Sequence, residues 1–156
     1  MKSQRSYLKG QDGFTLVELI ISAAIGALLL SALTSVMLTS WRGATIAASR
    51  VEASGQIRNF EYFAYDDFAR SATPSGSGCP CTTQPLVLSG ITYAWDGSSF
   101  LDRAVASTGA TEHAATDVTA FSWYVDTDST VVVSLTITIQ AYSESQTFRF
   151  YPRVNP

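Results

Sequence analysis

The sequence predicts an α+β protein in which a long N-terminal helix packs on an antiparallel β-sheet. Three observations support this prediction. The run from Leu19 to Trp41 contains no formally charged residue. The segment after it repeats apolar residues every three or four positions, as a helix on a core does. The rest of the chain alternates apolar and polar residues between turn signals, as strands do. We therefore divide the chain into residues 1–13, 14–41, 42–71 and 72–156.

Composition sets limits on function. The chain has 156 residues, a one-domain length, and 46% of them are hydrophobic, which suffices for both a membrane segment and a core. The formal net charge is −3 and no Lys follows Lys9, so the chain has no basic stripe for nucleic acid. No phosphate loop, nucleophile elbow or paired catalytic motif occurs in the sequence. We expect neither enzymatic activity nor a cofactor.

Residues 1–13 form a short basic leader, and residues 14–41 form a helix long enough to span a membrane. A span needs roughly 20 apolar residues. The leader carries Lys2, Arg5 and Lys9, so by the positive-inside tendency it stays in the cytoplasm. The chain after Trp41 is then expected outside the inner membrane, in the periplasm. The alternative is an ordinary secretory signal with loss of the whole helix, but such signals have shorter apolar regions of about 7–15 residues.

Glu18 is the acid at the head of this apolar run. An ionised carboxylate at membrane depth costs about 2.5–3.5 kcal/mol on insertion scales. An acid retained at this position is therefore a candidate functional residue.

Residues 42–71 are expected to continue the helix as an amphipathic half. Gly43 and Gly55 each cost about 1 kcal/mol relative to Ala, so we expect bends or frayed points there. Pro74 and the glycines around it end the helix in a loop. The expected core-facing stripe is Ile46, Arg50, Ala53, Ile57, Phe60, Ala64 and Phe68, flanked by Phe63.

The remaining residues are expected to form a meander of antiparallel strands, with one apolar face covered by the amphipathic half of the helix. Asp96-Gly97 is a strong hairpin signal between two of the strands. Residues 106–116, rich in Ala, Thr and Gly, are expected to be an exposed loop, and residues 143–145 a turn. The expected strands are residues 87–95, 99–105, 118–125, 131–140 and 147–151.

The stretch Gly13-Phe14-Thr15-Leu16-Val17-Glu18, with a basic leader before it and an apolar helix after it, resembles the class III signal of type IV pilins and type II secretion pseudopilins. The resemblance implies the ladle-shaped pilin fold. It also implies that a prepilin peptidase cuts between Gly13 and Phe14 and methylates the new amine. The implied partners are other pilin or pseudopilin subunits, and the implied final location is a filament at the cell surface.

The resemblance further implies that Glu18 pairs with the Phe14 amine of a neighbouring subunit. From the residues alone, other possibilities stay open. Glu18 lies one helical turn from Phe14, so it can pair with its own amine instead. It can also remain an idle, ionised carboxylate among lipid headgroups.

Within the family, the stretch from Phe60 to Ala72, with its Asp67 and Arg70, resembles the end of the long helix in J-type pseudopilins and PilW-like minor pilins. The hairpin from Tyr93 to Val105 is similar to theirs too. This implies a minor subunit that acts in pilus assembly, secretion or DNA uptake. The alternative is a single-span receptor or adhesin that never polymerises.

Cys79 and Cys81 are the only cysteines. A local disulfide, reduced thiols, pairing with another chain, or redox activity all remain open. Zinc would need about four Cys or His ligands, and two Cys with His113, expected in a solvated loop, are too few. Asp126 and Asp128 could offer oxygens to calcium, but the other positions of a calcium loop are missing. We expect no metal site.

Overall fold

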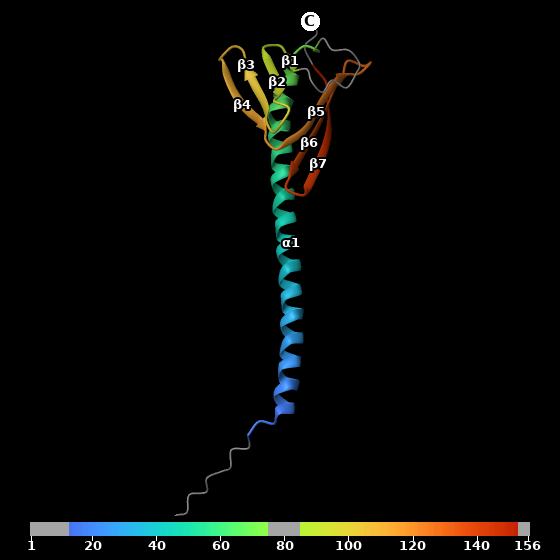
Figure 1. The fold of residues 1–156 in the computed structure, drawn as a ribbon. Helices are drawn as coiled ribbons and strands as arrows, with labels where there is room; N and C mark the ends of the chain where they lie inside the picture. The colour runs from blue at the N-terminus through green and yellow to red at the C-terminus, as the bar shows by residue number, and fades with distance from the viewer. Residues whose placement is uncertain (1–12, 75–84, 153–156) are drawn as a thin grey trace, which may run out of the picture. The chain divides into compact units, whose positions relative to one another are not determined.

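The computed structural model describes residues 13–74 and 85–152. The chain divides into two compact units, Met1–Gly43 and Ala44–Pro156, and helix α1 (Leu16–Ala69) contributes to both (Figure 1). Within residues 85–152, the second unit also holds seven strands. They are β1 (Leu86–Leu88), β2 (Ile91–Trp95), β3 (Leu101–Val105), β4 (Ala110–Ala115), β5 (Val118–Val125), β6 (Val131–Ile139) and β7 (Tyr142–Phe150).

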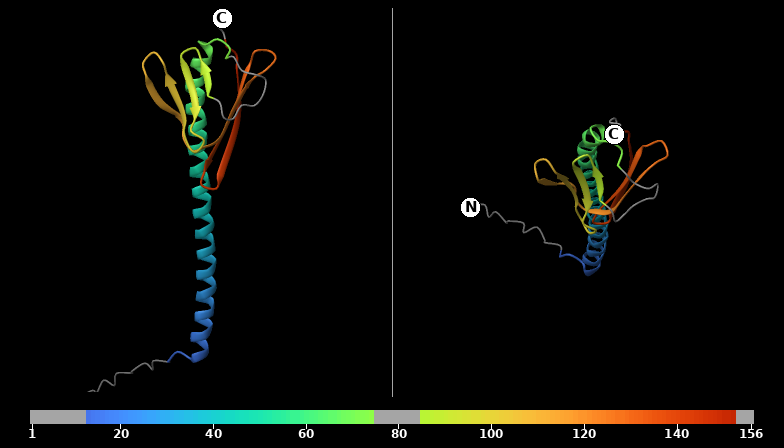
Figure 2. Two further views of the ribbon diagram at one scale, coloured as in Figure 1. Left: turned by 45° about the horizontal axis from the view of Figure 1, so that its top comes forward. Right: turned by 90° about the horizontal axis from the view of Figure 1, so that it is seen from above.

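The strands form two antiparallel sheets rather than one. The first has the order β1-β2-β3-β4 and the second the order β5-β6-β7, so each strand pairs with its neighbour in the chain. The two sheets lie on either side of the last part of α1, as two further views show (Figure 2). The predicted α+β class, a long helix packed on antiparallel strands, is confirmed.

The second half of α1 provides the core of this unit. Ala53, Ile57, Phe60, Ala64 and Phe68 are all buried, as the predicted stripe requires. The start of the stripe was predicted wrongly, because Ile46 and Arg50 are exposed. The helix also continues through Gly43 and Gly55, where bends or frayed points were expected.

Phe60 is the centre of an aromatic cluster that joins the helix to both sheets. Its ring lies 5.7 Å from that of Tyr93 in β2 and 5.4 Å from that of Phe148 in β7. Two helical turns further on, Phe68 stacks on Phe150 with ring centroids 4.2 Å apart. Well-oriented aromatic pairs add about 0.5–1.5 kcal/mol beyond the area that they bury. The helix therefore packs against both sheets and covers their apolar faces.

The hairpin at Asp96-Gly97 forms as predicted. Asp96 Oδ1 accepts hydrogen bonds from the backbone N–H groups of Ser98, Ser99 and Phe100, at 2.8, 2.8 and 3.0 Å. Gly97 has a φ of 80°, a conformation that glycine adopts without strain. Hydrogen bonds from Ser98 and these N–H groups hold the pKa of the Asp96 carboxyl well below its usual range.

Three strand predictions were wrong in detail. The segment expected to be one strand, residues 87–95, turns at Gly90 (φ 81°) and forms both β1 and β2. Residues 106–116, expected to be a loop, contain β4, which pairs with β3. Residues 143–145, expected to be a turn, lie inside β7, which begins at Tyr142. Both β4 and the first part of β7 are polar edge strands, so they lack the apolar alternation that marks a half-buried strand.

Candidate functional site

Thr15 caps the amino terminus of α1. Its Oγ1 accepts a hydrogen bond from the backbone N–H of Glu18 at 3.3 Å, and its carbonyl accepts one from Leu19 N–H at 3.2 Å. Thr15 and Glu18 are thus spaced as in a capping box, in which the acid also favours the positive end of the helix dipole. This cap by Thr15 was not predicted, although the Thr-x-x-Glu spacing was a visible signal for it.

The predicted processing site lies in an open part of the chain. Phe14 is 78% exposed. Gly13 has so much room that a Cβ built on it would meet no atom within 4 Å. Nothing in the described chain therefore blocks access to the bond between Gly13 and Phe14, and Gly13 is not required by the chain's own packing.

The first part of α1 presents its apolar side chains outward. α1 is long and apolar enough to cross a membrane, and its most apolar stretch has no buried residue. The large exposed side chains in this part include Leu19, Ile20, Ile21, Ile25, Leu28, Leu29, Leu30, Leu33, Val36, Met37 and Leu38. So much exposed apolar surface needs a lipid or protein partner from outside this chain.

Several hydroxyl groups in this part of α1 bond to carbonyls of the helix itself. Ser31 and Thr34 donate to the carbonyls of Leu28 and Leu30, each at 2.8 Å. Ser35 and Thr39 donate to earlier carbonyls in the same way, at 2.9 Å. A polar group without a partner in hydrocarbon costs several kcal/mol, and these bonds remove that cost.

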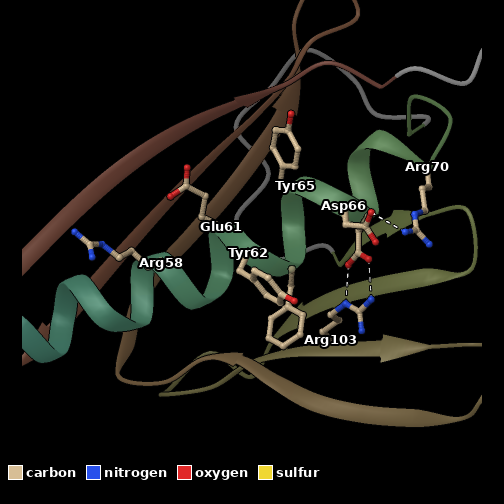
Figure 3. Close-up of a pocket in the computed structure, with 9 residues that line it drawn as sticks. Arg58, Glu61, Tyr62, Tyr65, Asp66, Arg70 and Arg103 are labelled. Carbon is tan, nitrogen blue, oxygen red and sulfur yellow. Dashed lines mark hydrogen bonds and ion pairs between the residues drawn. The ribbon is translucent and has the colours of Figure 1, made fainter.

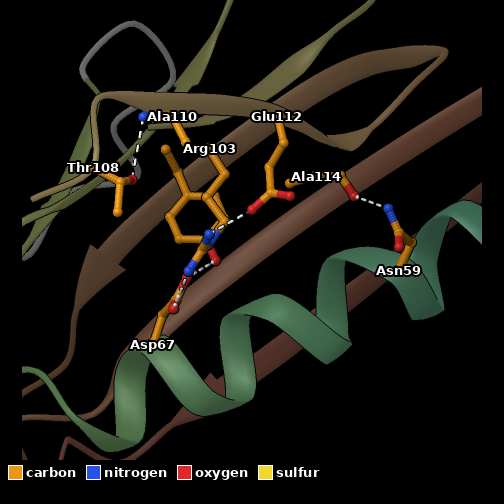
Figure 4. A network of polar contacts seen from close by, with 8 residues as sticks. Asn59, Asp67, Arg103, Thr108, Ala110, Glu112 and Ala114 are labelled. Carbon is orange, nitrogen blue, oxygen red and sulfur yellow. Dashed lines mark hydrogen bonds and ion pairs between the residues drawn. The ribbon is translucent and has the colours of Figure 1, made fainter. Parts of the chain in front are cut away.

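In the second unit, a buried ion pair ties the end of α1 to the four-stranded sheet (Figure 4). The Asp67 carboxylate accepts from Arg103 Nε at 2.6 Å and from its second guanidinium nitrogen at 2.7 Å. The Tyr93 hydroxyl also donates to Asp67. Arg103 in turn contacts Glu112 of β4 at 2.6 Å and lies over the Phe63 ring. Asp67 had been singled out only for a resemblance, not for this contact.

The electrostatics of this network follow from its burial. The side chain of Asp67 is 4% exposed and that of Arg103 is 15% exposed. Hydrogen bonding to Asp67 raises the pKa of Arg103 above its usual value. Burial, and then the Asp67 carboxylate, raise the pKa of Tyr93 well above its usual value, so this hydroxyl stays a donor. The network therefore fixes the end of α1 against the four-stranded sheet, and its charged groups are paired. We call these four residues, Asp67, Tyr93, Arg103 and Glu112, the lock.

Beside this lock, α1 borders an open hollow of about 670 Å³ (Figure 3). Tyr62 and Tyr65, which line it, are 77% and 67% exposed. Arg70, the residue after α1, pairs with Asp66 of the helix at 2.9 Å. The other lining residues include Arg58, Glu61 and Arg103. The mixture of exposed tyrosine and arginine is typical of protein contact surfaces.

The remaining candidate residues do not come together as a metal site. His113 is not in a loop as expected but in β4, where its Nδ1 lies 2.6 Å from Asp102 Oδ1 and its ring stacks on Phe100. Asp126 and Asp128 bond to the backbone of their own turn. Within residues 13–74 and 85–152, no three His, Cys, Asp or Glu side chains are placed to share a metal ion. Cys79 and Cys81 lie outside the described residues, so their pairing stays a prediction.

A comparison with known protein families places the start of the chain in a described family motif. Residues 8–34 match the family described as the prokaryotic N-terminal methylation motif. No curated protein and no solved structure matches the chain significantly. The matched segment includes Gly13, Phe14 and Glu18 and the first part of the exposed apolar helix. It ends before the second unit, Ala44–Pro156, which we call the head. Together, the methylation motif, the long apolar helix and the antiparallel β head support a type IV pilin-like or pseudopilin protein.

Proposed function

We propose that this chain is a minor pilin or pseudopilin, a structural subunit of a type IV pilus or of a type II secretion-like filament, and not an enzyme. The observation that carries the proposal is the methylation motif over residues 8–34, which includes the start of an apolar helix whose most apolar stretch has no buried residue. In this role a prepilin peptidase cleaves after Gly13. The subunit waits in the inner membrane with its head in the periplasm, and then joins other subunits in the filament.

One contact in the head supports the minor-subunit part of the proposal. Two stretches resemble minor subunits, residues 60–72 at the end of α1 and the hairpin from Tyr93 to Val105. Asp67 of the first stretch bonds to Tyr93 and Arg103 of the second. The two resembling stretches thus contact each other in the folded chain, which supports considering them together as one feature.

Mass spectrometry of the mature amino terminus tests the processing step. The native protein should begin with N-methyl-Phe14. A Gly13→Leu variant should keep its leader, and because Gly13 has open space around it, the fold should not change. A native chain that retains Met1 and is never found with other pilin-like subunits would support a single-span receptor or adhesin instead.

Two substitutions of Glu18 distinguish two candidate roles of its side chain, pairing with the Phe14 amine and capping the helix. Gln can replace Glu in a capping box, but it carries no charge. If Glu18 pairs with the amine of Phe14, both Glu18→Gln and Glu18→Ala should be cleaved but fail to enter filaments, as measured by sedimentation and immunoblotting. If Glu18 only caps the helix, Glu18→Gln should assemble normally and Glu18→Ala should not. Normal assembly of both variants would contradict any assembly role.

A further inference from the structure

Helix α1 begins just after the bond that the proposed function would have cut. The helix starts at Leu16, and Gly13, Phe14 and Thr15 precede it. The Phe14 side chain is exposed, and a Cβ built on Gly13 would meet no atom within 4 Å. The bond between Gly13 and Phe14 therefore lies outside the helical hydrogen-bond ladder, where a peptidase can reach it.

The side chain of Thr15 favours this start. Its Oγ1 accepts a hydrogen bond from Glu18 N–H at 3.3 Å, and its carbonyl accepts one from Leu19 N–H at 3.2 Å. The first N–H groups of a helix have no partner inside the helix, and a capping hydroxyl satisfies one of them. The cap therefore stabilises a helix that begins at Leu16 relative to one that begins elsewhere.

The sequence offers a second start one turn earlier. Asp12 lies three residues before Thr15, and Asp is among the residues that cap helices best. A helix capped by Asp12 would take Gly13 and Phe14 as its first two residues. Without the cap at Thr15, the helix can either fray or begin earlier. Fraying leaves N–H groups unbonded, which is costly next to an apolar span, so the earlier start is favoured.

The two starts differ in what they offer a peptidase. When the helix begins at Leu16, the Gly13 carbonyl carbon is open to attack. When it begins after Asp12, the same bond lies in the first helical turn, which has to unwind before cleavage. If opening and closing are fast, the rate of cleavage follows the population of the open form. A residue that holds the start at Leu16 therefore speeds cleavage without touching the reacting atoms.

We propose that Thr15 is a positioning residue for leader cleavage, because its cap keeps the bond between Gly13 and Phe14 outside helix α1. This inference rests on the proposed function, since it presupposes a peptidase that cuts at this bond. Thr15 acts through the backbone of the first turn, so another side chain that can cap should replace it. A valine has the same shape but cannot accept the hydrogen bond from Glu18, so it should not.

The test follows the loss of the leader from the full-length chain over time, in membranes that contain a prepilin peptidase, by mass spectrometry. Thr15→Val should be cleaved about fivefold more slowly than the native chain, which is the effect expected from one helix cap. Thr15→Ser keeps the acceptor and should be cleaved at the native rate. Thr34→Val is the matched control and should also be cleaved at the native rate, because the Thr34 hydroxyl donates to the Leu30 carbonyl further along the same helix.

A double variant separates positioning from direct recognition of Thr15 by the peptidase. Asp12→Ala with Thr15→Val removes the cap of the earlier start as well, so the bond should return outside the helix and cleavage should recover. If the peptidase recognised the Thr15 side chain itself, the double variant would stay slow. Asp12→Ala alone should be cleaved at least as fast as the native chain. Thermal unfolding of the head should be the same in every variant, since all these substitutions lie before Ala44.

Four results would overturn the inference. They are cleavage of Thr15→Val at the native rate, a Thr15→Ser variant or a Thr34→Val control as slow as Thr15→Val, and a double variant that stays slow. In each case the native chain is still cut after Gly13, so the proposed function stands. A native chain that keeps its leader would instead overturn the proposed function and this inference with it.

Discussion

The two parts of helix α1 differ in the exposure of their apolar side chains and in the partners of their polar ones. Before Gly43, apolar residues such as Leu28 are about two-thirds exposed, and the hydroxyls bond back to their own helix. After Gly43, apolar residues such as Phe60 are fully buried, and polar side chains reach other elements. Ser54 donates to Glu144 of β7, and Asn59 donates to the carbonyl of Ala114 in β4. The first part therefore exposes apolar surface that can contact lipid or other proteins, and the second part supplies the core of the head.

The largest expected effect comes from separating the two parts. A fragment that begins at Ala44 keeps every core residue of the head and loses the exposed apolar helix. We expect it to be soluble without detergent, monomeric by gel filtration, and cooperative in thermal unfolding. The full chain should instead stay with membranes until detergent is added. An aggregated fragment, or one without a cooperative transition, would show that the head depends on the first part.

Truncation of a core aromatic should be the next largest effect. Phe60→Ala removes the ring at the centre of the aromatic cluster, and such changes cost about 3–5 kcal/mol. Tyr62→Ala removes a ring of similar size that is largely exposed on the same helix, and it should cost less than about 0.5 kcal/mol. Urea unfolding of the head fragment measures both. Equal losses would contradict the division of the helix into a buried and an outward face.

The ion pairs at the end of α1 offer a sharper test. Asp67→Ala leaves Arg103 without its buried partner, and breaking such a pair costs about 3 kcal/mol. The neighbouring Asp66→Ala breaks only an exposed pair with Arg70, which is worth about 0–1 kcal/mol. The difference between the two free energies of unfolding measures how far burial matters. A double variant, Asp67→Leu with Arg103→Met, should recover much of the loss because no unpaired charge remains.

Alkaline pH should weaken the head through Tyr93. Its pKa is raised in the folded protein, whereas an unfolded tyrosine ionises near about pH 10. Above that pH the unfolded state releases a proton that the folded state keeps, so stability present at lower pH falls as pH rises. Unfolding monitored between about pH 9 and 11 measures this slope, and Tyr93→Phe should reduce it. If Tyr93→Phe leaves the pH dependence of the free energy of unfolding unchanged, another titratable group causes the loss of stability.

The helix was the most predictable element, and the details of the sheets were the least. A long apolar run and a one-sided stripe are local patterns, so the sequence alone predicted α1, the buried Phe60 and Phe68, and the Asp96-Gly97 hairpin. β4 was missed because its polar residues from Thr111 to His113 are exposed on an edge strand, and its pairing with β3 is not a local property.

The candidate site was predictable to a similar extent. Gly13, Phe14 and Glu18 stand in one short motif, which is recognised together with the basic leader before it and the apolar helix after it. The contact between Asp67 and Arg103 joins residues 36 positions apart. Nothing in the spacing of one polar residue on a helix and another on a strand indicates that they meet. Likewise, the division into two sheets depends on which strands leave their edges unpaired, and no local pattern encodes that choice.

The lock at the end of α1 has a consequence for engineering and for divergence. Asp67 lies on the helix and Arg103 on the hairpin. If either segment is moved alone into another protein, it therefore carries a charged side chain without its partner. A chimaera that exchanges heads must therefore move residues 67 and 103 together. A transferred piece that keeps both charges paired must therefore include the end of α1 together with the hairpin that carries Arg103.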